Sequence, residues 1–154
     1  MRTIPLFDDL CLQGASARIE LRITTTSTKA MGKGLSQLGK VWNPVTGCTK
    51  YSDGCKNCYA LDRLIPLMKN NKYRNGGRVT CHVDLLDVPR KKKRPGAFFV
   101  NNMGDIFHEE VPFSFLKDLF RTMNECSRHT FRALTKRTPR LLEYAPHLNW
   151  SNNI

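Results

Sequence analysis

The sequence predicts an α/β fold of parallel strands that alternate with helices, and three observations support this class. Residues 97–100 form a short apolar run without alternation, which is typical of a strand buried on both faces of a parallel sheet. Residues 129–134 are predicted to form a second buried strand. A polar stretch and then apolar positions at helical spacing follow each run. Strand, helix, strand and helix joined by short links indicate parallel β–α units.

The 154-residue chain is long enough for one domain with a hydrophobic core, and its first part differs from the rest. Residues 19–23 alternate between apolar and charged side chains like a short strand, and a polar run at 24–29 follows. We expect residues 1–40 to be a poorly ordered N-terminal extension of a domain at 41–154, with Met31 as a plausible start. The alternative is an ordinary N-terminal strand that packs on the core.

The elements of the first half follow from local patterns. A first candidate strand at 41–42 leads into a cysteine-containing loop. The apolar spacing that follows predicts a helix that starts near Asn57. Pro66 is expected to kink or end this helix, because proline lacks the backbone N–H and crowds the preceding turn. Residues 78–83 are β-prone, and residues 90–95 are predicted to form a basic loop.

The elements of the second half follow in the same way. Pro112 is expected at the first position of a helix, where its missing N–H costs nothing. Just before it, His108, Glu109 and Glu110 are interpreted as the solvated start of that helix rather than as acid–base groups. Thr138 is predicted to be the N-cap of the next helix. Residues 152–154 resemble the first step of another strand.

Composition narrows the class of protein. No run approaches the eighteen apolar residues of a membrane span, and no secretory signal develops at the N-terminus. Six cysteines without an export signal favour the reducing cytoplasm and metal ligation over disulfides. The net charge of +12 favours a polyanionic partner such as nucleic acid. The alternative is that the basic surface only keeps the protein in solution.

The stretch with the strongest chemical signal holds three cysteines, Cys48, Cys55 and Cys58, in the spacing C-x6-C-x2-C. Gly47 and Gly54 precede two of them, so the loop has the turn chemistry to bring three thiols together. Three thiolates indicate a soft metal, either zinc or an iron–sulfur cluster. Structural zinc normally takes four protein ligands, whereas a [4Fe–4S] cluster held by three cysteines leaves one iron open.

Polar residues follow the other strands as well. Residues 101–105 come after one buried run and residues 135–137 after the next. In parallel β–α folds the chemistry lies at the carboxyl ends of the strands. Asp105, an acidic residue at such an end, is a candidate site residue.

The motifs point to one family. The chain resembles a phage and prophage three-cysteine family of unknown function, usually placed near the radical S-adenosylmethionine (SAM) superfamily. The resemblance covers about residues 41–154 and rests on WNPVTGC, GCKNCYA, FFVNNMGDIFHEEVP and HTFRALTKR.

This resemblance implies a partial (β/α) barrel with helices on the outside, incomplete at the C-terminus, and therefore a truncated member of the family. It implies a [4Fe–4S] cluster on Cys48, Cys55 and Cys58 and the reductive cleavage of SAM for a substrate that stays open. In such a protein Asn101, Asn102 and Asp105 would contact SAM, and Lys136 and Arg137 would meet an anionic substrate.

A second hypothesis belongs to another class. Cys81 or His82 could supply a fourth ligand to the three cysteines and complete a zinc site. The protein would then be a zinc-stabilised, basic module that binds nucleic acid without catalysis.

Overall fold

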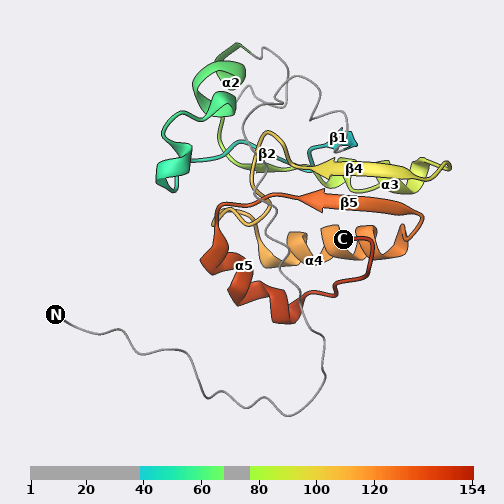
Figure 1. Ribbon diagram of the computed structural model, residues 1–154. Coiled ribbons are helices and arrows are strands. Elements are labelled where there is room, and N and C mark those ends of the chain that lie inside the picture. The colour runs from blue at the N-terminus through green and yellow to red at the C-terminus, as the bar shows by residue number, and fades with distance from the viewer. Residues whose placement is uncertain (1–38, 68–76) are drawn as a thin grey trace, which may run out of the picture.

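A computed structural model describes residues 39–67 and 77–154 of the chain (Figure 1). The expected strand at 19–23 and the suggested start at Met31 lie outside these residues. In the described part a parallel sheet holds β1 (Lys40–Trp42), β4 (Gly96–Val100) and β5 (His129–Ala133), in the order β1-β4-β5. Helix α4 (Phe113–Glu125) connects β4 to β5 and runs along one face of the sheet (Figure 1).

The register of the sheet agrees with the predicted arrangement. Strand β4 pairs with β5 in parallel from Gly96↔His129 to Val100↔Ala133, and β1 pairs with the second half of β4. The prediction that the stretches 97–100 and 130–134 hold neighbouring parallel strands is therefore confirmed, as is the α/β class. The expectation that the second strand is buried is wrong, because only His129 and Phe131 of the five residues of β5 are buried. The sheet of the described residues does not close into a barrel.

Aromatic packing builds the core between the sheet and α4. The rings of Phe98 and Phe131 stack with their centroids 5.5 Å apart, and Trp42 lies 5.7 Å from Phe131. Leu119 and Met123 of α4 are fully buried against this layer. Each large apolar side chain buried in this way contributes about 1.5–3 kcal/mol. The apolar runs of the strands and the apolar stripe of α4 thus bury each other.

A second, antiparallel pair leads to the cysteines. Strand β2 (Val45–Thr46) pairs with β3 (Thr80–Cys81), and a parallel bridge joins Gly47 to Gly104. Of the β-prone stretch 78–83, only the two residues of β3 form a strand, because a 3-10 turn, η3 (Val83–Leu85), begins directly after His82. These short pairings extend the line of β1 towards the carboxyl edge of the parallel sheet.

Several predicted boundaries shift. The helix expected from Asn57 begins as a π-helical turn, η2 (Ala60–Leu64), and continues as α2 (Ile65–Leu67) through Pro66. The proline is tolerated because the wider π turn precedes it and Ile65 N–H bonds to the Ala60 carbonyl. Helix α3 (Val88–Lys91) takes up the first residues of the expected basic loop. A 3-10 turn, η1 (Asp53–Cys55), lies inside the cysteine loop.

The later helices start one residue away from the predicted positions. Pro112 has an extended backbone and caps α4 instead of being its first residue. Helix α5 (Thr138–Tyr144) includes Thr138, with Arg137 as its cap, and continues into η4 (Ala145–His147). No helix of the described residues is long and apolar enough to cross a membrane.

The expected strand at 152–154 is a turn. The Asn153 carbonyl nevertheless accepts a hydrogen bond from Phe131 N–H at 2.6 Å, so these residues lie along the free edge of β5. The Asn153 side-chain amide also donates to the carbonyls of Met123 and His129.

Candidate functional site

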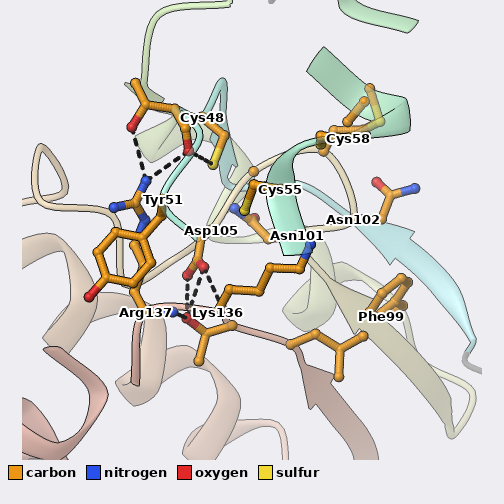
Figure 2. A pocket seen from close by; sticks show the side chains of 16 residues that line it. Cys48, Tyr51, Cys55, Cys58, Phe99, Asn101, Asn102, Asp105, Lys136 and Arg137 are labelled. Atoms are coloured by element: carbon orange, nitrogen blue, oxygen red, sulfur yellow. Dashed lines mark hydrogen bonds between the residues drawn. The ribbon is translucent and has the colours of Figure 1, made fainter. Parts of the chain in front are cut away.

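A cavity of about 400 Å³ lies at the carboxyl edge of the parallel sheet (Figure 2). Four segments line it: the cysteine loop at 48–60, the end of β4, the loop at 101–105, and residues 134–137 after β5. All eight residues singled out as site candidates line this one cavity: Cys48, Cys55, Cys58, Asn101, Asn102, Asp105, Lys136 and Arg137. Their placement together follows from the parallel topology, and their individual roles stay predictions.

The three cysteines of the loop are free thiols held at different depths. Cys48 is fixed by the backbone, because its N–H donates to the Gly77 carbonyl at 3.2 Å. Burial raises the pKa of the Cys48 thiol, although the neighbouring Arg137 opposes this. Burial tends to raise the pKa of the Cys55 thiol as well. Its pKa is nevertheless lowered overall, because the thiolate is stabilised by hydrogen bonds from the backbone of Tyr51 and Ser52 and by the charge of Lys136.

The three thiols face a shared cavity without converging on one point. Among the described residues, no three His, Cys, Asp or Glu side chains come close enough together to hold a single metal ion. Figure 2 shows the three cysteines on the part of the cavity wall that the cysteine loop forms. The three thiols therefore line one cavity without forming a site for a single ion among the described residues.

Arg137 is the best-anchored side chain of the site and is only 2% exposed. Its guanidinium donates to the Glu109 carboxylate and, at 3.0 Å each, to the carbonyl and the hydroxyl of Thr49. It also stacks over the Tyr51 ring at 4.7 Å and contacts the Cys48 thiol (Figure 2). These partners occupy the group, so a positioning role fits it better than the expected contact with an anionic substrate.

Asp105 joins two of the loops that line the cavity. Its carboxylate accepts hydrogen bonds from Phe107 N–H at 2.9 Å, from the Thr135 hydroxyl at 2.8 Å and from Lys136 N–H at 3.1 Å. Both oxygens are therefore engaged. The side chain ties the loop after β4 to the loop after β5, which leaves little of it for a ligand.

Asn101 and Asn102 line the cavity, and each has one buried side-chain atom without a hydrogen-bond partner among the described residues. Asn101 adopts a left-handed backbone with φ of 58°, and its Oδ1 accepts from Val45 N–H at 3.2 Å. Its buried Nδ2 and the buried Oδ1 of Asn102 have no hydrogen-bond partner among the described residues. An unsatisfied buried polar group costs about 1–3 kcal/mol, so one donor and one acceptor remain to be used.

His108 differs from the expectation of a solvated helix start, because it is only 2% exposed. Its Nδ1 accepts from Glu110 N–H at 3.1 Å, so Nε2 carries the proton and donates to the Thr49 hydroxyl at 2.8 Å. Burial, and then the charge of Arg137, lower the pKa of His108. Glu109 and Glu110 are exposed as expected. Sequence analysis missed Thr49, which has no motif and gains its partners only in the folded chain.

The remaining candidates are Lys136 and the two residues proposed as a fourth zinc ligand, Cys81 and His82. The Lys136 ammonium donates to the Gly54 carbonyl at 2.7 Å and otherwise faces solvent. Cys81 packs against the main core, and His82 shares a hydrogen bond of 2.7 Å with Thr46. Neither Cys81 nor His82 lines the cavity, so the structure does not bring the expected fourth ligand to the cysteines.

Comparison with known proteins gives one match. Residues 34–154 match the model of a family described as a protein of unknown function, DUF5131. Comparisons with curated proteins and with solved structures find no match.

Proposed function

The chain belongs to the DUF5131 family, whose description leaves the activity open, and we propose that it is an iron–sulfur protein of the radical SAM type. Cys48, Cys55 and Cys58 would hold a [4Fe–4S] cluster at the carboxyl edge of the sheet. When bound, such a cluster supplies the single electron that cleaves SAM reductively to methionine and a 5′-deoxyadenosyl radical. The observation that carries the proposal is the shared cavity of three thiols and two unsatisfied asparagine amides.

The donor set favours a cluster over structural zinc. A structural zinc site normally takes four protein ligands in a tetrahedron. The cavity presents three thiols, and the carboxylate of Asp105 already has hydrogen bonds on both oxygens. Three sulfur donors around a cavity of about 400 Å³ are compatible with a cluster that keeps one iron for another ligand.

Asn101 and Asn102 are the candidates for holding SAM. The unpaired Nδ2 of Asn101 and Oδ1 of Asn102 are buried, so each side chain would have to turn towards the cavity to use them. Nδ2 would then donate to a carboxylate, and Oδ1 would accept from an amino group. A methionine moiety carries both of these groups. Asp105 would shape the loops around SAM, and Arg137 would hold the cysteine loop. The exposed Lys136 is the cation left to meet an anionic substrate.

The sheet supports the finer fold assignment. Strands β1, β4 and β5 are parallel and adjacent, and α4 covers one face, as helices cover the outside of a (β/α) barrel. The exposed Val41 and Leu134 lie on or beside strands of this sheet. A partial barrel, a relationship to phage three-cysteine proteins and a cytoplasmic location are parts of the same proposal.

Anaerobic reconstitution of the full chain with iron and sulfide tests the proposal. We expect a brown protein with broad absorption near ~400 nm, and Cys55→Ala should lose this absorption. Cys81→Ala is the matched control, because Cys81 does not line the cavity, and it should keep the colour. After reduction with dithionite, SAM should be converted to 5′-deoxyadenosine. A colourless protein with one zinc per chain would favour the zinc module instead.

A further inference from the structure

A second charged feature lies away from the cavity. Residues 90–94, here called the basic loop, are five consecutive cations at the end of α3 and before β4. The loop lies beside the tail of the β4 arrow in Figure 1, whereas the cavity lies at its tip. Five residues of strand span roughly 16 Å, so the basic loop and the cavity are separate surfaces.

Side chains from the start of β5 fix the backbone of the basic loop. Arg128 donates to the carbonyl of Lys92 at 3.1 Å, of Arg90 at 2.9 Å and of Pro89 at 3.4 Å. His129 Nε2 lies 3.1 Å and 3.0 Å from the carbonyls of Pro89 and Lys92. The loop is thus held in one shape before any ligand binds, which reduces the entropy cost of binding.

Three of the five cations combine an exposed side chain with the absence of any ion pair or ring contact among the described residues. Arg90 pairs with Asp87 and Glu125, and the Lys92 ammonium lies 5.2 Å from the centroid of the Phe98 ring. Lys91, Lys93 and Arg94 are exposed and have no ion pair with any described residue.

We infer that the basic loop is a docking surface for the phosphate backbone of double-stranded nucleic acid. Lysine and arginine that neutralise phosphates release condensed counterions, which drives binding without sequence information. No exposed aromatic side chain lies within the loop, so it lacks the stacking platform that single strands use. The net charge of +12 adds long-range attraction for the same partner.

The test measures the affinity of the full-length protein for a labelled, mixed-sequence DNA duplex of about two helical turns over a salt series. The triple variant Lys91→Gln/Lys93→Gln/Arg94→Gln removes the three unpaired charges. It should bind more than about tenfold more weakly at 0.1 M salt, and the slope of log K against log salt should become less negative by about 2.7. The matching RNA duplex, as a second arm, shows which duplex is preferred.

The control triple, Arg63→Gln/Arg78→Gln/Lys117→Gln, removes the same charge from exposed positions elsewhere that also have no ion pair with any described residue. It should bind nearly as the parent does, and thermal unfolding should show both triples folded. The inference is overturned if the parent binds no duplex, if both triples lose affinity equally, or if poly-glutamate displaces the duplex at equal charge concentration. This binding does not depend on the cluster, so the test also stands apart from the proposed function.

Discussion

Arg137 links the first cysteine to the two loops that follow β4 and β5. It reaches Thr49, which is 88 positions away in the sequence, as well as Glu109 and the Tyr51 ring. The forked guanidinium can serve these partners at once, whereas a lysine ammonium is a single point of charge. The position of Cys48 therefore depends on the shape of this group as well as on its charge.

Arg137→Lys should accordingly lower the free energy of unfolding by about 1–3 kcal/mol and reduce the iron bound after reconstitution. Urea unfolding and iron analysis measure the two effects. Glu109→Gln is the matched comparison and should cost less, because the Glu109 side chain is 55% exposed and its ion pair is screened. Equal iron content in the parent and in Arg137→Lys would remove Arg137 from the cysteine site.

His108 predicts a pH dependence of stability. Its pKa is lowered by burial, so the folded protein holds the neutral ring while the unfolded chain binds a proton below about pH 6.5. The stability from the neutral ring is therefore complete above that pH and is lost as the pH falls. Urea unfolding of metal-free protein between pH 7.5 and 5 should show this decline, and His108→Gln should flatten it. An unchanged slope in the variant would assign the decline to other groups.

At the scale of secondary-structure elements, the pairing of β2 with β3 depends on Gly47. Its φ is 83°, and an added Cβ would lie 2.1 Å from the Arg78 carbonyl oxygen, a backbone atom that cannot move aside easily. The close approach lets β2 pair with β3 and lets Cys48 bond to Gly77. Glycine is required here for two reasons, the left-handed backbone and the missing space.

Gly47→Ala should therefore cost more than about 3 kcal/mol of folding free energy or prevent folding. Gly54→Ala in the same loop is the control: its Cβ would meet nothing closer than 3.7 Å, so the cost should stay below about 1 kcal/mol. Chemical unfolding of the two variants gives the comparison. Similar stability for both would mean that the pairing of β2 with β3 does not fix the cysteine loop.

Local patterns predicted the elements whose residues bury one another along regular faces. The apolar run at 97–100, the predicted strand at 129–134 and the apolar stripe on α4 identified the parallel unit and the edge where the candidate site lies, although β5 is buried at only two of its residues. The same patterns could not show that Arg137 is occupied by Thr49 and Glu109, or that His108 is buried. Those properties come from contacts between residues far apart in the sequence, and the local spacing of apolar residues contains no information about such contacts.

The parallel sheet as a whole has β1 and β5 at its edges among the described residues. Unpaired strand edges are sites of unwanted association unless something covers them. The edge of β5 is covered by the residues around Asn153, whose carbonyl accepts a hydrogen bond from Phe131 N–H. Ile154 packs against the main core. The last residues of the chain therefore belong to the folded unit.

Asn153→Asp tests this closure. The Asn153 amide donates to carbonyls of Met123, Cys126 and His129 at 3.1, 3.5 and 2.9 Å. A carboxylate would face three carbonyl oxygens without a proton to share, so we expect a loss of more than about 2 kcal/mol in urea unfolding at pH 7. Asn152→Asp places the same charge one residue earlier, on an exposed side chain, and should change stability by less than about 0.5 kcal/mol. At pH 4 the gap between the two variants should narrow, because protonation restores a donor at position 153. Equal stability of the two variants at pH 7 would show that the β5 edge is not closed by this segment.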